Sequence, residues 1–156
     1  MVDLDRGDMA ILHALQDDAR NATTESIGER VDLAASTVAA RIKNLEENGV
    51  ITGYEPEIDY ETAGFEQRML LVGSIQGNDE QIVTAVSDLE NVISVRRLLT
   101  DEDDLHIELV SRSQERAEAV TDELHELGIE ITKTSVIVEA ARQSFDHFGE
   151  KYTTDG

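Results

Sequence analysis

The spacing of apolar residues changes at Gly49, and this change constrains the fold more than any other feature of the sequence. Before Gly49, apolar residues recur every three or four positions, which is typical of helices that bury one face. After Gly49, short apolar runs of strand length alternate with helical segments. A single repeating pattern cannot satisfy both spacings. We therefore expect the 156 residues to form a helical unit followed by a mixed helix-and-sheet unit.

Three short helices are predicted in the N-terminal part. The first runs from about Asp5 to Leu15, with Asp3 or Asp5 as its N-cap, and the second begins near Thr23. The third runs from about Ser36 to Asn48 and is followed by the glycine expected just beyond a helix C-terminus. The second and third helices are joined by only three or four residues, as a helix-turn-helix requires. Residues 1–52 are therefore predicted to form a helix-turn-helix DNA-binding domain.

The rest of the chain has the element order of a ferredoxin-like domain. We expect a linker strand over 53–66, a βαββαβ domain over 67–140 and a C-terminal tail over 141–156. The fold class is α+β, with both helices of the second domain on one face of its sheet. The other face of that sheet would then need a partner, so the protein is expected to form at least a homodimer.

The third helix carries the candidate DNA-binding residues. Its apolar residues Val38, Ile42 and Leu45 are spaced to face the core, which leaves polar and small side chains on or near the opposite face. Arginine can bind guanine, asparagine can bind adenine, and hydroxyl groups can bind either bases or phosphates. The predicted DNA-binding residues are Ser36, Thr37, Ala40, Arg41, Lys43 and Asn44. The alternative is a plain helical hairpin whose outer face is simply solvated.

The net charge opposes this prediction and suggests the conditions under which it could hold. The chain has 34 acidic and 13 basic residues, a formal charge of −21, and residues 1–64 carry 5 bases against 14 acids, a net of −9. At 1 M salt the screening length is roughly 3 Å, so repulsion from DNA is largely screened. Such acidity is typical of halophilic proteins, and an ordinary acidic protein is the alternative. DNA binding by this chain should depend on salt far less steeply than counterion release implies.

Several motifs resemble the leucine-responsive/AsnC family of transcription regulators. The resemblance rests on Leu4-Asp5-Arg6, on Ser36-Thr37-Val38, on Arg41 to Glu47 and on Gly49 to Tyr54, and it covers nearly the whole chain. It implies a winged helix-turn-helix followed by an effector-binding βαββαβ domain of the RAM/AsnC type. It also implies that dimers assemble into tetramers or octamers. The run Phe145 to Phe148 resembles the close of haloarchaeal members.

Three positions depart from the family pattern. Asp32 stands where the helix-turn-helix usually has glycine, and Asp tolerates a left-handed backbone better than most residues. Ala34 replaces the usual serine cap of the third helix, so Ser36 or Asp32 must cap it or the cap is weak. Asp101 replaces a glycine of the loop that, in the family, helps to hold an amino-acid effector where subunits meet.

The acidic turn from Thr100 to Asp104 has three competing interpretations. The resemblance implies an effector site, in which Thr100, Asp101 and Asp104 bind an amino group with Ser135 nearby. Consecutive carboxylates could instead bind a hard cation such as Mg²⁺ or K⁺. The turn could also be no more than a solvated, halophilic surface loop.

Other classes of function find little support in the sequence. There is no cysteine, no phosphate-binding glycine loop and no Gly-x-Ser-x-Gly motif, and the four histidines occur singly. We therefore predict no catalytic residues, metal site or cofactor, and a soluble cytoplasmic protein with no membrane segment. Two alternatives stay open: an enzyme resembling siroheme decarboxylases, which share this two-part build, and a metabolite-binding protein that does not bind DNA.

Overall fold

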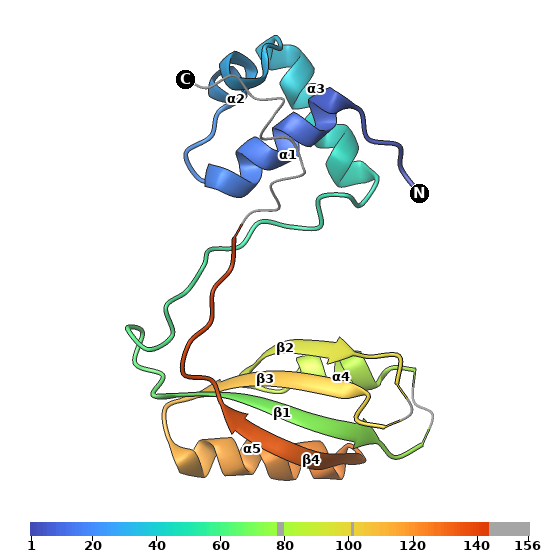
Figure 1. Ribbon diagram of the computed structural model, residues 1–156, viewed down its shortest axis with the longest axis vertical. Helices are drawn as coiled ribbons and strands as arrows, with labels where there is room; N and C mark the ends of the chain where they lie inside the picture. The colour runs from blue at the N-terminus through green and yellow to red at the C-terminus, as the bar shows by residue number, and fades with distance from the viewer. Residues whose placement is uncertain (78–79, 101, 144–156) are drawn as a thin grey trace. The chain divides into compact units, whose positions relative to one another are not determined.

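The structure is a computed structural model that describes residues 1–77, 80–100 and 102–143. The chain divides into two units, of which the first contains Met1–Pro56 and the second is Glu57–Ala140. Figure 1 shows helices in the first unit and a sheet with helices in the second. Each unit has its own cluster of buried apolar residues.

The first unit consists of α1 (Arg6–Asp18), α2 (Thr24–Val31) and α3 (Ala35–Glu47). Asp5 caps α1 in a reciprocal capping box with Asp8, and Thr23 caps α2 in the same way with Ser26. The N-cap of α3 is Ala34, which makes no side-chain cap, so of the two alternatives, a cap from Ser36 or Asp32 and a weak cap, the structure has the second. Apolar side chains of all three helices form the core: Ala10, Ile11, Leu12, Ala14, Ile27, Val31, Val38 and Leu45.

The turn between α2 and α3 depends on two backbone features. Asp32 adopts a left-handed conformation (φ 56°, ψ 50°), as predicted for the residue that replaces glycine there. The carbonyl of Gly28 accepts hydrogen bonds from the N–H groups of Asp32 and Leu33. A Cβ atom on Gly28 would lie 2.5 Å from the carbonyl oxygen of Leu33, so only glycine allows the chain to pass this close.

The segment between α3 and β1 corrects one prediction. The linker strand expected over 53–66 is not formed, and these described residues instead include a turn closed by hydrogen bonds from the N–H of Gly64 to Glu61 and of Phe65 to Tyr60. An extended segment becomes a strand only when another strand pairs with its backbone, and the strands of the sheet pair with one another. The rings of Tyr60 and Phe65 pack edge to face, with centroids 5.9 Å apart.

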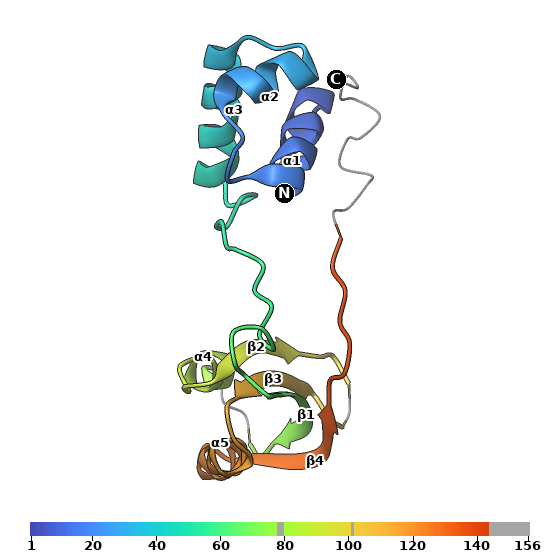
Figure 2. The same ribbon diagram turned by 90° about the vertical axis from the view of Figure 1, so that its left-hand side faces the viewer.

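The second unit is a four-stranded antiparallel sheet in the order β2-β3-β1-β4. Its elements are β1 (Gln67–Ile75), α4 (Ile82–Ser87), β2 (Val92–Arg97), β3 (Leu105–Ser111), α5 (Gln114–Glu126) and β4 (Ile129–Val136). Both helices lie on the same face of the sheet (Figure 2). The predicted α+β fold class, a helix-turn-helix unit followed by a ferredoxin-like domain, is therefore confirmed.

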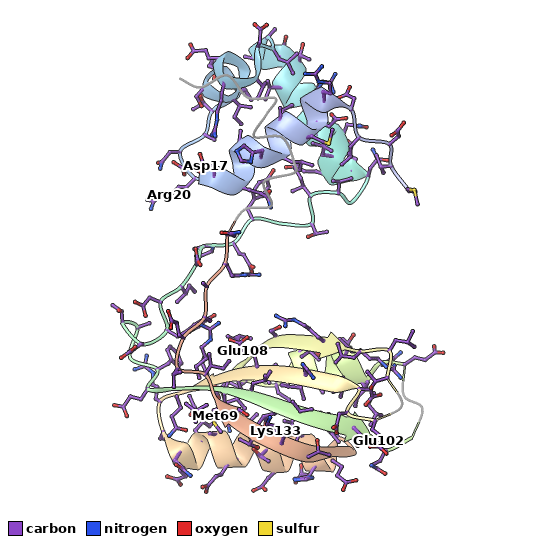
Figure 3. All side chains as sticks on the ribbon, in the orientation of Figure 1. Asp17, Arg20, Met69, Glu102, Glu108 and Lys133 are labelled. Carbon is purple, nitrogen blue, oxygen red and sulfur yellow. The ribbon has the colours of Figure 1, made fainter. Side chains whose placement is uncertain are left out.

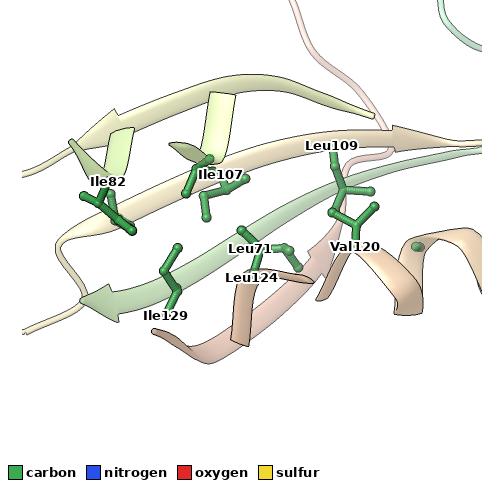
Figure 4. Packing of buried hydrophobic residues seen from close by; sticks show 10 residues of the cluster. Leu71, Ile82, Ile107, Leu109, Val120, Leu124 and Ile129 are labelled. Atoms are coloured by element: carbon green, nitrogen blue, oxygen red, sulfur yellow. The ribbon is translucent and has the colours of Figure 1, made fainter. Parts of the chain in front are cut away.

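The core of the second unit lies between the sheet and its helices. Leu71, Ile107 and Leu109 point from the central strands toward Val120 and Leu124 of α5 (Figure 4). The strand register shifts between Val72 and Gly73 where β1 pairs with β4. Leu127 is 37% exposed because it lies at the C-cap of α5, beyond the last buried turn.

Candidate nucleic-acid interface

The exposed face of α3 and the start of α1 border an open groove of about 610 Å³, here called the α3 groove. The groove is lined by Asp5, Asp8, Ser36, Thr37, Ala40, Arg41 and Asn44. Five of the six predicted DNA-binding residues therefore lie around one hollow in the surface. Lys43 is the exception: it is exposed, and its Nζ lies 3.7 Å from Glu47 Oε1 one turn further along the helix.

Helical periodicity explains why these side chains share a face. Val38 and Leu45 are buried in the core of the unit, and Ile42 packs against it. Positions one turn apart along the opposite side of α3 then face outward together. Ser36, Thr37, Ala40 and Asn44 are exposed as a result, while Arg41 is half-buried. The small Ala40 leaves room for a ligand to approach the helix backbone.

Arg41 is bound to the N-terminus of α1. Its Nη1 donates to Asp5 Oδ1 (2.7 Å), Asp5 Oδ2 (2.8 Å) and Asp8 Oδ1 (2.9 Å). From the sequence alone, Arg41 is predicted to contact DNA and Asp5 only to cap the first helix. The two carboxylates were missed because they lie 33 and 36 residues away in the sequence. The sequence signal that could have indicated these partners is the spacing of Asp5 and Asp8, three residues apart at the start of a helix.

The charges in this cluster stabilise one another. The hydrogen bond from Arg41 is the main cause that lowers the pKa of Asp5, and the backbone N–H of Asp8 adds to it. The same contacts with Asp5 and Asp8 raise the pKa of Arg41. The side chains differ in exposure, at 58% for Asp5, 30% for Arg41 and 14% for Asp8. The α3 groove therefore contains a fixed, charged triad rather than an isolated cation.

The acidic turn of the second unit is engaged with its own sheet. Asp104 Oδ1 accepts a hydrogen bond from the backbone N–H of Ile75 (3.1 Å), and Asp103 Oδ1 accepts one from the hydroxyl of Thr132 (2.6 Å). The hydroxyl of Thr100 donates to the carbonyl of Glu102. The carboxylates of Asp103 and Asp104 thus accept hydrogen bonds from their own sheet. Asp101 lies outside the described residues.

Ser135 does not join the turn within one chain. It pairs with Leu70 of β1, whereas Asp104 contacts Ile75, five residues further along the same strand. At about 3.4 Å per residue, the two positions are roughly 17 Å apart along β1. Asp104 and Ser135 are therefore not brought together in a single copy of the chain.

The histidines and acids of the described ranges form no metal site, since no group of three or more potential ligands is found there. His13 is buried in the first unit, and its Nδ1 has no hydrogen-bond partner in the described structure. His106 is half-buried on β3, where it pairs with Val72 and Arg96. Within the same ranges, no helix is long and apolar enough to cross a membrane.

Comparison with known proteins supports a DNA-binding role for the first unit. Residues 4–52 match the family described as winged helix-turn-helix DNA-binding. The chain is 28% identical to an uncharacterized HTH-type transcriptional regulator of Pyrococcus abyssi, and the match covers 91% of this chain and 97% of that protein.

Solved structures share the whole two-part fold. The leucine response regulatory protein LrpA of Mycobacterium tuberculosis is similar with a TM-score of 0.79 at 20% identity, over 90% of this chain and 96% of that one. A transcriptional regulator of Neisseria meningitidis, solved in complex with L-Met, is similar with a TM-score of 0.76 at 24% identity, over 91% and 94%.

The match of the first unit, the full-length relative and the shared fold agree with the motifs found in the sequence. They define the first unit as a winged helix-turn-helix, and the whole chain is similar to helix-turn-helix transcription regulators. It shares its fold with the leucine response regulatory protein LrpA and with LrpC of B. subtilis, which agrees with the resemblance of its motifs to the leucine-responsive/AsnC family. The run Phe145 to Phe148, which suggested a haloarchaeal member, lies outside the described residues, and the halophilic origin stays a prediction.

Proposed function

We propose that this protein binds duplex DNA in a sequence-specific manner by inserting α3 into the major groove. The observation that carries the proposal is the convergence of Ser36, Thr37, Ala40, Arg41 and Asn44 on the α3 groove. Hydroxyl, amide and guanidinium groups on one helix face can form hydrogen bonds with base edges. The exposed Lys43 adds a cation at the rim, suited to a phosphate.

We further propose that the protein acts as a dimer or a larger assembly. The burial of β1 supports this: Leu71 points into the core, while its neighbours Leu70 and Val72 are half-buried on the face that the helices leave open. A second sheet packed there would cover these side chains. Two copies of α3 could then contact half-sites about one helical turn apart, roughly 34 Å.

The effector is proposed to be an amino acid bound near the turn at residues 100–104. Support comes from the Neisseria regulator, which was solved with L-Met and shares this fold. Ser135 lies roughly 17 Å from Asp104 along the sheet, so a site using both requires a second chain. Effector binding at such a site would change the assembly and thereby couple effector affinity to DNA affinity.

The DNA-binding proposal is tested by selection from a random-sequence duplex library in molar KCl, followed by fluorescence anisotropy with the enriched duplex. The expected result is enrichment of a near-palindromic sequence bound at least about a thousandfold more tightly than a scrambled duplex, in line with ordinary specific binding. Replacing Asn44 by Ala should lower this ratio. No enrichment in molar KCl would refute the proposal.

The effector proposal is tested separately by thermal unfolding of the full chain with each of the twenty amino acids. A specific ligand raises the unfolding temperature as its concentration exceeds its Kd.

Incubation with siroheme, followed by absorbance spectroscopy, distinguishes the regulator from a siroheme-decarboxylase-like enzyme. The relatives named as regulators favour the first of these.

A further inference from the structure

Arg41 uses a single nitrogen for its bonds to α1. All three hydrogen bonds to Asp5 and Asp8 come from Nη1. Among the described residues, no hydrogen bond is found for Nη2 or Nε of Arg41. A guanidinium group has five N–H donors in a fixed plane, so fixing one corner also sets the direction of the remaining donors.

The backbone of α1 confines the same guanidinium group from another side. A Cβ atom on Gly7 would lie 3.2 Å from both Cζ and Nη1 of Arg41. The side chain therefore packs directly against the first turn of α1, at a position where glycine leaves space for it. Its placement depends on α1 as much as on α3, the helix that carries it.

We infer that Asp5 and Asp8 are positioning residues for DNA recognition, because they hold Nη1 of Arg41 on α1 and leave Nη2 and Nε as the donor edge offered to a base in the α3 groove. This inference rests on the proposed function. Arginine binds guanine through two donors, so the orientation of its plane determines whether both can be used. Residues outside the helix-turn-helix helices thus contribute to sequence specificity.

The two carboxylates have opposite effects on specific and non-specific binding. They orient Arg41, which favours the correct sequence, but they also place negative charge beside the phosphates of any DNA. Removing one carboxylate should therefore reduce discrimination between sequences and increase affinity for unrelated DNA. If the carboxylates had only a structural role, or only repelled DNA, their removal would not lower discrimination and raise affinity for unrelated DNA at the same time.

The decisive variant is Asp5→Asn, because asparagine is as good an N-cap as aspartate and α1 should still begin correctly. Asp17→Asn is the matched control. Asp17 lies in the last turn of α1 and, like Asp5, binds an arginine, with its Oδ2 2.9 Å from Nη1 of Arg30. Its side chain is 60% exposed against 58% for Asp5. It does not line the α3 groove (Figure 3 labels it near the end of α1).

The experiment measures anisotropy of the full chain with the duplex enriched by the wild-type protein and with a scrambled duplex, over a range of KCl concentrations. For Asp5→Asn we expect the ratio of specific to non-specific affinity to fall about tenfold, the effect of one lost bidentate contact. Affinity for the scrambled duplex should rise, and its dependence on log[KCl] should become steeper by about one unit. Arg41→Lys should also lower the ratio of specific to non-specific affinity, since the lysine ammonium group does not offer two donors in a fixed plane.

Several results would overturn the inference. If Asp5→Asn raises both affinities by the same factor, the carboxylate only repels DNA. If it behaves like Asp17→Asn, the triad has no role in recognition, and if a folded Asp5→Asn loses both affinities equally, its role is structural. Failure of the wild-type protein to prefer any duplex would instead refute the proposed function, and the inference with it.

Discussion

Replacing Gly28 by Ala should destabilise the first unit, although the same change in an ordinary helix is stabilising. Gly28 lies inside α2, and alanine is more favourable than glycine in a helix interior by about 1 kcal/mol. Here, however, the new Cβ would lie 2.5 Å from the carbonyl oxygen of Leu33. The backbone on which α3 begins would have to move away from α2.

The expected loss can be worked out from this contact. Forcing a methyl group into a close-packed site typically costs 1–3 kcal/mol. Moving Leu33 would also weaken the 2.9 Å hydrogen bond from its N–H to the Gly28 carbonyl, worth about 1 kcal/mol. After the helix-propensity gain of about 1 kcal/mol, the net loss is about 1–3 kcal/mol. In a unit of this size each 1 kcal/mol lowers the midpoint of unfolding by roughly 4–8 °C.

The assay is thermal unfolding of the full chain, with hydrogen exchange of α1 to α3 to assign the change to the first unit. Gly53→Ala is the control, because no atom lies within 4 Å of the Cβ it would add. The control should leave the midpoint nearly unchanged. A rise in stability for Gly28→Ala would refute the argument that close backbone contact defines this turn.

Three further predictions follow from local contacts. Ala34→Ser should stabilise the first unit by about 1 kcal/mol, measured by urea unfolding, because it supplies the missing cap of α3, whereas Ala39→Ser in mid-helix should not. The pKa of Asp5 lies below its ordinary value of 3.8. The ionised carboxylate therefore contributes to folding stability above that pH, and this contribution is lost as the pH falls through the lower folded value. Acid unfolding followed by circular dichroism should accordingly be less steep in Asp5→Asn than in the wild-type protein. Asp104→Ala should destabilise the second unit by about 1 kcal/mol, because the N–H of Ile75 loses its acceptor, while Asp104→Asn should retain most of the stability in the same unfolding assay.

The fold was predictable because it follows from local patterns. Apolar spacing located all three helices of the first unit and the order of elements in the second. The left-handed Asp32 and the uncapped start of α3 were also predictable, since both depend on a single residue and its neighbours. The linker strand was not, because pairing with another strand decides whether an extended segment is a strand.

The candidate site was predictable only in part. Helical periodicity placed Ser36, Thr37 and Asn44 on one exposed face, as it must for any amphipathic helix. The partners of Arg41 come from another helix, and no periodicity relates them to α3. The role of Gly28 was missed for the same reason, since its importance arises from a carbonyl beyond the end of its own helix.

The two units have separate buried cores, and the residues that form one do not appear in the other. A substitution that loosens the helical core therefore leaves the packing between the sheet and its helices intact. Natural variation can then alter the proposed DNA-binding face without disturbing the domain proposed to sense metabolites. Such modularity would let related proteins diverge in the DNA sequence they prefer while they keep the same response to an effector.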